Sequence, residues 1–126
     1  MRHGIYIASR TRHAPRWRAM RASGIPIIST WIYEAEEGQT SDWADLWSRC
    51  VQESSSCRGL ILYAEPPEDD CLSGALIEAG VALGAGVPVY VVGESKSIRK
   101  FVKHPLVKKC STIEEAIEEI GRYLEL

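Results

Sequence analysis

Short runs of apolar residues recur along the chain and are separated by polar or helix-forming segments. Four such runs cover residues 5–8, 26–30, 60–63 and 87–92, and a weaker run near Val107 follows them. Strands that are apolar at successive positions are typical of a parallel sheet that helices cover on both faces. Glycine, proline, serine and charged residues bound the runs and favour turns there. The pattern therefore predicts five strands.

Helical signals lie between these runs. Pro15 is suited to the first turn of a helix that Gly24 ends. Ser41 or Asp42 can cap a second helix, in which apolar residues recur at the spacing of one helical face. These residues are Trp43, Leu46, Trp47, Cys50 and Val51. We expect packing along this face to account for both tryptophans.

Three further helices are predicted in the second half of the chain. Ser73 can cap a helix that runs over residues 74–85, and a weaker helical pattern covers residues 97–103. Ser111 and Glu114 have the spacing of a capping box, which opens an amphipathic last helix. Strand and helix patterns thus alternate about five times.

This alternation predicts one three-layer α/β domain over residues 1–126, with a flavodoxin-like (Rossmann-like) fold. Because crossovers between parallel strands are right-handed, we expect a five-stranded parallel sheet with the order 2-1-3-4-5. Ligands bind beyond the carboxyl ends of the strands in such sheets. Residues 9–12 and 65–73 are expected to converge at that edge.

Composition and charge narrow the class of protein. With 45% hydrophobic residues, 25% charged residues and a net charge of −2, the chain resembles a globular domain and not a coat for nucleic-acid polymers. The four cysteines form no CxxC pair and the three histidines are scattered, so we expect no metal site. The apolar run over residues 71–93 is interrupted by Glu78, Pro88 and glycines, and no leader pattern precedes it. We therefore expect a cytoplasmic protein without a membrane span.

Glu78 is the only strongly ionisable residue between residues 71 and 93. Burying a carboxylate without a partner is expensive and raises its pKa, and functional sites tolerate that expense. Two other interpretations are an exposed stripe on the helix and a buried ion pair with an arginine. The spacing alone leaves all three open.

The sequence around this glutamate resembles the nucleoside 2-deoxyribosyltransferase family, including the related nucleoside 5′-monophosphate N-hydrolases. The likeness spans nearly the whole chain and begins with the strand at residues 5–9. Its most specific part is Gly74-x-x-x-Glu78-x-Gly80, followed by Gly86-x-Pro88-Val89. The strand at residues 59–63 and the Glu-Pro-Pro loop after it add to the likeness.

The resemblance implies that Glu78 is a nucleophile that attacks C1′ of a ribosyl or deoxyribosyl group, as in a retaining glycosidase. It also implies that Tyr6 lies near Glu78 and orients it by a hydrogen bond, although a core tyrosine explains that position equally well. In members that act on monophosphates, the loop after the first strand and the turn before the glutamate helix hold the phosphate. The corresponding residues here are Ser9, Arg10, Arg12, Ser73 and Gly74.

Two departures from the family concern the acid that assists the departing base. Cys50 falls where the family usually has an aspartate, and Arg58 falls where an acidic residue usually precedes the third strand. Four aspartates are candidates to replace the missing acid or to contact the substrate: Asp42, Asp45, Asp69 and Asp70. Trp31 after the second strand has two interpretations, stacking on a base or packing in the core.

The leading hypothesis is an enzyme that cleaves the N-glycosidic bond of a nucleoside or nucleoside 5′-monophosphate and transfers the sugar to another base or to water. One alternative is a non-catalytic nucleotide-binding module, which Cys50 favours. A third is a structural or interaction protein, for which Trp31, Trp43 and Trp47 would supply a partner surface. The resemblance implies a homo-oligomer, with the apolar helix over residues 72–85 suited to an interface, and the covalent ester requires no cofactor.

Overall fold

The computed structural model describes residues 4–34, 40–65 and 72–125. Within them, four parallel strands form one sheet in the order β1-β2-β3-β4. The strands are β1 (Ile5–Ala8), β2 (Gly59–Ala64), β3 (Val89–Gly93) and β4 (Val107–Cys110). The chain is therefore an α/β protein with a parallel sheet, compatible with a Rossmann-like fold.

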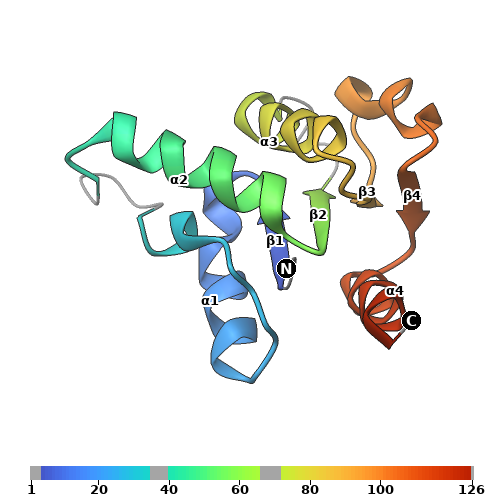
Figure 1. Ribbon diagram of the computed structural model, residues 1–126, viewed down its shortest axis with the longest axis horizontal. Helices are drawn as coiled ribbons and strands as arrows, with labels where there is room; N and C mark the ends of the chain where they lie inside the picture. The colour runs from blue at the N-terminus through green and yellow to red at the C-terminus, as the bar shows by residue number, and fades with distance from the viewer. Residues whose placement is uncertain (1–3, 35–39, 66–71, 126) are drawn as a thin grey trace.

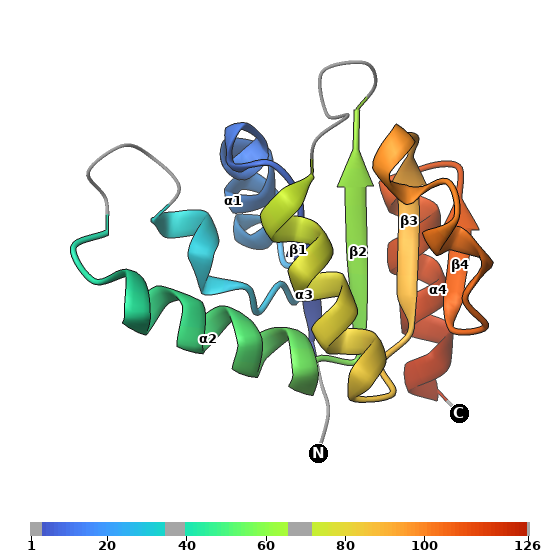
Figure 2. The same ribbon diagram turned by 90° about the horizontal axis from the view of Figure 1, so that it is seen from above.

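Helices cover both faces of this sheet (Figures 1 and 2). The α-helices are α1 (Ala14–Ala22), α2 (Trp43–Ser56), α3 (Ser73–Gly84) and α4 (Ile113–Glu125). Helices α2 and α3 lie on one face, whereas α1 and α4 lie on the other. The three-layer arrangement follows from strands that are apolar on both faces: every residue of β1 is buried, as is almost every residue of β2 and β3.

The prediction of five strands in the order 2-1-3-4-5 is wrong, because residues 26–30 form no strand. Only Ile27 pairs with β1, through a single parallel bridge to Ile5. Beyond this bridge, the Oγ of Ser29 accepts the N–H of Ile7 at 3.2 Å, and the indole of Trp31 donates to the Ile7 carbonyl at 2.8 Å. Side chains thus form the hydrogen bonds to the backbone of Ile7 that a neighbouring strand would otherwise have formed. A 3-10 helix, η2 (Thr30–Tyr33), begins there instead.

One of the three predicted helix N-caps is present in the structure, and the other two differ from the prediction. Asp42 caps α2 by accepting the N–H of Asp45 at 3.0 Å. Leu72, not Ser73, is the N-cap residue of α3 and makes no side-chain cap. The predicted capping box is displaced by one residue: Thr112 accepts the N–H of Glu115 at 3.1 Å, and the Glu115 carboxylate accepts the N–H of Ser111 at 2.8 Å.

The helix predicted over residues 97–103 is replaced by two 3-10 turns, η3 (Lys96–Ile98) and η4 (Phe101–Lys103). Like charges three and four positions apart destabilise an α-helix. Lys96, Arg99, Lys100 and Lys103 have this spacing. The turns lead into β4, whose central residues Lys108 and Lys109 are exposed, as expected of an edge strand.

The prediction that packing accounts for Trp43 and Trp47 is also wrong. The buried face of α2 consists of Leu46, Cys50 and Ser54, at a spacing of four residues. Trp43 lies beside this stripe and is 65% exposed, and Trp47 is 39% exposed. An amphipathic helix buries only one stripe of its surface, so residues at the border of the stripe remain partly in solvent.

No helix in the described part of the chain combines the length and apolar character needed to cross a membrane.

Candidate functional site

Glu78 and Tyr6 meet between the sheet and α3. Tyr6 is fully buried in β1, and strand alternation directs it to the face that α3 covers. Its hydroxyl donates a hydrogen bond to Oε2 of Glu78. Glu78 lies on the buried side of α3 and is 8% exposed. The expected contact between these two residues is therefore present in the structure.

Burial determines the charge state of this glutamate. It raises the pKa of the Glu78 carboxyl from about 4.5 to about 8. The hydrogen bond from Tyr6 favours the carboxylate form, but one donor does not offset the loss of hydration. At neutral pH the carboxyl is therefore mostly protonated in the ligand-free protein. A positive charge that develops beside it would favour ionisation.

The other two interpretations of Glu78 do not match its surroundings. Its low exposure excludes a solvated stripe on α3. Its partner is the phenol of Tyr6, and no ion pair of Glu78 occurs among the described residues. A buried titratable group with a raised pKa is a candidate functional group, because perturbed pKa values cluster at functional sites.

The loop after β1 supplies the predicted basic residues at the carboxyl edge of the sheet. The Oγ of Ser9 accepts the indole N–H of Trp17 at 2.9 Å, so this hydroxyl faces α1 and not Glu78. Arg10 is exposed and extended just before the short turn η1 (Thr11–His13). A guanidinium nitrogen of Arg12 lies 4.0 Å from the carboxylate of Glu65 at the end of β2.

The convergence of residues 9–12 with Glu65 is thus present. Asp69 and Asp70 lie outside the described residues.

One arginine of the basic N-terminal region is held by aromatic rings. Arg16 lies over the rings of Trp17 and Tyr63, with its guanidinium carbon 5.3 and 5.2 Å from their centroids. It also donates to the Tyr63 hydroxyl at 3.2 Å. These contacts are on the α1 side of the sheet, opposite Tyr6 and Glu78. They give part of the basic region a packing role.

The first turn of α3 adjoins α2. Ser73 is exposed and Gly74 is half-buried at this end of the helix. A Cβ built at Gly74 would lie 3.6 Å from Cη2 and 3.9 Å from Cζ2 of Trp47. The indole of Trp47 therefore lies beside the turn that precedes Glu78, a contact that the sequence pattern did not indicate.

Trp31 is a packing residue in this structure. It is 6% exposed, and its indole N–H is engaged by the Ile7 carbonyl. The ring therefore fixes η2 against the end of β1. Of the two interpretations of Trp31, core packing is the one its surroundings favour.

The candidate acids on α2 are occupied by structural contacts. Asp42 caps the helix, and Asp45 accepts from Nε of Arg49 at 2.9 Å. Burial raises the pKa of the Cys50 thiol to about 11, so this residue does not replace a carboxylic acid. Neither Asp42, Asp45 nor Cys50 therefore replaces the aspartate that the sequence resemblance implies at position 50.

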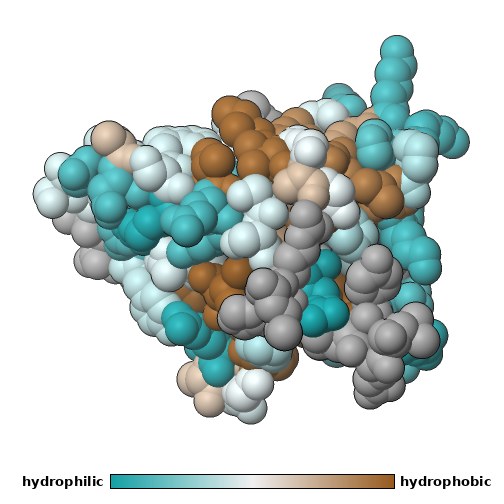
Figure 3. Space-filling model, in the orientation of Figure 1, coloured by the Kyte–Doolittle hydropathy of each residue, from teal (hydrophilic) through white to brown (hydrophobic). Residues whose placement is uncertain are grey.

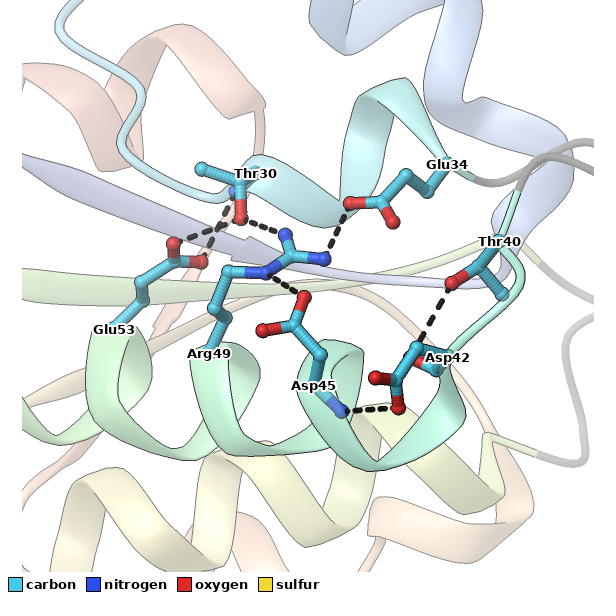
Figure 4. A network of polar contacts seen from close by, with 7 residues as sticks. All are labelled: Thr30, Glu34, Thr40, Asp42, Asp45, Arg49 and Glu53. Carbon is cyan, nitrogen blue, oxygen red and sulfur yellow. Dashed lines mark hydrogen bonds and ion pairs between the residues drawn. The ribbon is translucent and has the colours of Figure 1, made fainter.

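Arg49 is the centre of a polar network that sequence reasoning missed (Figure 4). Besides Asp45, its guanidinium contacts the Thr30 hydroxyl at 2.7 Å and the Glu34 carboxylate at 2.6 Å. Glu53, one turn further along α2, accepts the backbone N–H of Thr30 at 3.0 Å and its hydroxyl at 2.8 Å. The network ties α2 to both ends of η2.

The described residues contain no group of three or more His, Cys, Asp or Glu side chains that could hold a metal ion. Searches with protein-family models and against curated proteins give no match to this chain.

Proposed function

We propose that the protein cleaves the N-glycosidic bond of a nucleoside or a nucleoside 5′-monophosphate, with Glu78 as the nucleophile. The observation that carries the proposal is the buried Glu78 carboxyl on a glycine-rich helix, hydrogen-bonded by Tyr6. The sequence resemblance to the nucleoside 2-deoxyribosyltransferase family points to the same two residues. On this proposal the sheet is flavodoxin-like. Residues 26–30 then take the position of the edge strand beside β1, although only Ile27 pairs with it.

The proposed reaction has two displacements at C1′. In the first, Oε1 of ionised Glu78 bonds to C1′ while the bond from C1′ to the base nitrogen breaks, and its electron pair leaves with the base. In the second, another base or water attacks C1′ and the Glu78 carboxylate departs. Tyr6 donates to Oε2 and so holds the carboxylate with its other oxygen toward the sugar. The positive charge that develops on the sugar favours the ionised form of Glu78.

The substrate-binding residues of this proposal lie at the carboxyl edge of the sheet. Arg10 and Arg12 supply positive charge after β1, and the amides of Ser73 and Gly74 begin α3. Guanidinium groups and helix N-terminal amides are both good partners for phosphate, so a 5′-monophosphate fits this edge. No cofactor takes part, because the ester with Glu78 carries the sugar. The buried cysteines Cys50, Cys57 and Cys110 form no disulfide with one another, which suits the proposed cytoplasmic location.

The alternative is a non-catalytic nucleotide-binding module with the same pocket. The observation that favours it is Cys50, whose thiol stands where the family has an aspartate and whose pKa is raised to about 11. Without an acid, the departure of the base is harder. A binding module would retain affinity for nucleotides and release no base.

Base release distinguishes these two functions. The wild-type protein, Glu78→Ala and Glu78→Gln are incubated with ribo- and deoxyribonucleosides and their 5′-monophosphates, with and without an acceptor base. Chromatography then measures free and exchanged base. Glu118→Gln removes an exposed carboxylate on α4 and serves as the matched control. We expect release by the wild type and the control only; a folded wild type that releases no base from any substrate would refute the enzymatic proposal.

We also propose that the chain assembles with a second copy of itself through the outer faces of α2 and α3. Three large apolar side chains, Trp43, Val51 and Ile77, are exposed there, and Trp47 lies at the border of this patch beside Gly74. Figure 3 shows hydrophobic surface gathered over α3. The exposed positions of α3 beyond Ile77 are Gly80 and Gly84, which carry no charge to meet a polar partner. A two-fold axis would place this patch against itself, as in most homodimers.

The oligomeric state of Ile77→Glu tests this interface. Ile77 is 55% exposed, so a charge at this position leaves the core intact but opposes burial in an interface. Leu106→Glu is the control, because Leu106 is exposed near β4. Light scattering should show a dimer or larger species for the wild type and the control, and a monomer for Ile77→Glu. A monomeric wild type would exclude the assembly.

A further inference from the structure

Trp47 lies next to the first turn of α3, one helical turn before Glu78. Gly74 and Glu78 are four residues apart, so they lie on the same side of α3, about 6 Å apart along its axis. Side chains in a helix tilt toward its N-terminus and cover the preceding turn. The Glu78 side chain therefore leans toward Gly74, the residue that the indole of Trp47 adjoins. The ring lies on the α2 side of the Glu78 site.

The ring of Trp47 is only partly used by the fold. Two of its six-membered-ring carbons approach Gly74, yet 39% of the residue remains exposed. Gly74 has no side chain to cover the indole. Trp17 and Trp31, by contrast, are buried, and each donates its indole N–H to a hydrogen bond. Trp47 is thus an aromatic side chain at the border of the site, with part of its surface uncovered by the chain itself.

We propose that Trp47 is a substrate-binding residue whose ring stacks against the nucleobase of the substrate. This inference rests on the proposed function. A nucleobase is a planar ring that leaves from C1′, the atom Glu78 attacks, so it lies within a few ångströms of the carboxylate. The face of an indole is a suitable platform for any base, and stacking contributes about 1–3 kcal/mol per base.

The assignment also orients the substrate. With the base against the exposed part of the Trp47 ring, the 5′ end of the sugar is left to the amides that begin α3 and to Arg10 and Arg12 in the loop after β1. An indole face offers no hydrogen bond to a phosphate, whereas those guanidinium groups do. Trp47 should therefore contribute equally to the binding affinity for nucleosides and for monophosphates.

Fluorescence quenching tests the stacking without catalysis. The Glu78→Gln protein and its Trp43→Phe and Trp47→Phe derivatives are titrated with adenine, guanine, cytosine, thymine and uracil. Trp43 is the matched control, since it is 65% exposed, one turn away on α2 and part of the same apolar patch. We expect at least one base to quench the emission, and the quenching to disappear only with Trp47→Phe. Quenching that persists in that variant, or is absent with every base, overturns the proposal.

Kinetics provide the second test. Trp47→Ala should raise the KM for nucleoside and monophosphate alike, by roughly 5- to 150-fold, with a smaller change in kcat. Trp47→Phe keeps an aromatic face and should recover most of the affinity, and Trp43→Ala should stay within about twofold of wild type. Equal effects of Trp47→Ala and Trp43→Ala on KM would assign Trp47 to the apolar patch and overturn the proposal. An effect on monophosphates alone would place Trp47 at the phosphate end of the substrate and overturn it as well.

The two proposals fail in different ways. If the wild type releases no base, the glycosidic function is lost, and the quenching titration still decides whether Trp47 contacts a base. If Glu78→Gln abolishes release but Trp47→Ala behaves as Trp43→Ala, the enzymatic function stands and the role of Trp47 is refuted. Light scattering on both alanine variants shows whether assembly is intact in each.

Discussion

Replacing Glu78 with Gln should stabilise the fold, and the gain should grow with pH. Glu78 ionises near pH 4.5 in the unfolded chain, whereas burial holds its pKa at about 8 in the folded protein. Between these values the folded state binds more protons than the unfolded state. The stability contributed by the protonated carboxyl is complete below pH 4.5 and is lost as pH rises through 8. Gln is neutral at every pH and shows no such loss.

The size of the effect follows from the two pKa values. One proton of difference changes the free energy of unfolding by about 1.4 kcal/mol per pH unit. The interval from about 4.5 to about 8 then corresponds to about 5 kcal/mol in total, of which about 3 kcal/mol is lost by pH 7 and about 1 kcal/mol by pH 5. The amide oxygen of Gln accepts the hydrogen bond from Tyr6, so that contact remains in the variant.

Urea unfolding at pH 5, 6, 7 and 8, at one protein concentration, measures this difference. The wild type, Glu78→Gln and Glu118→Gln are compared, because Glu118 is 67% exposed and forms only a surface ion pair with Arg122. The gain in free energy of unfolding for Glu78→Gln should rise by several kcal/mol from pH 5 to pH 8, and the control should follow the wild type. A gain that is the same at all four pH values would refute the assignment of a raised pKa to Glu78.

Three further predictions concern activity and stability. Tyr6→Phe removes the donor that favours ionised Glu78, so the acid limb of the kcat/KM profile should move to higher pH by about 1 unit, and an unchanged limb would contradict that role. Arg49→Met should lower the free energy of unfolding in urea by about 1–3 kcal/mol, because three polar groups lose their partner; a neutral result would mean that water replaces it. Gly93→Ala should lower the melting temperature sharply, since Gly93 has φ +93° and its new Cβ would meet a β2 carbonyl oxygen. Gly80→Ala on α3, where no atom lies within 4 Å of the new Cβ, should raise the melting temperature, and the reverse order would refute the steric argument.

The contact between Glu78 and Tyr6 is the part of the site that the sequence indicated best. Glu78 stood out because no other strongly ionisable residue occurs between residues 71 and 93. Its partner came from the family resemblance and not from periodicity, since a tyrosine in a buried strand has the same pattern whether or not it contacts a carboxylate. The hydrogen bond between them is a tertiary contact over 72 residues.

At the edge of the sheet beside β1, the pattern of apolar residues predicted a strand that is not formed. Residues 26–30 have the composition of a strand, but strand formation also needs backbone partners along its whole length. Ser29 and Trp31 satisfy Ile7 with side chains, and this competition between side-chain and backbone bonding has no signal in hydrophobic periodicity.

The polar network of Arg49 and the exposure of Trp43 and Trp47 were missed for a related reason. Helical spacing indicates which residues share a face, but it does not give the width of the contact that the face makes. Leu46 and Cys50 lie on the buried stripe of α2, and the tryptophans fall outside it. Likewise, the partners of Arg49 include Thr30, which is remote in sequence and becomes a neighbour only when η2 folds back on α2.

Both borders of the sheet are protected against aggregation by strand addition. At β1, the Ser29 hydroxyl and the Trp31 indole already bind the backbone groups of Ile7 that an incoming strand would need. At β4, exposed Lys108 and Lys109 carry charges that oppose pairing with a like strand. A foreign β-strand would therefore meet occupied backbone groups at Ile7 on one border of the sheet and a pair of positive charges on the other.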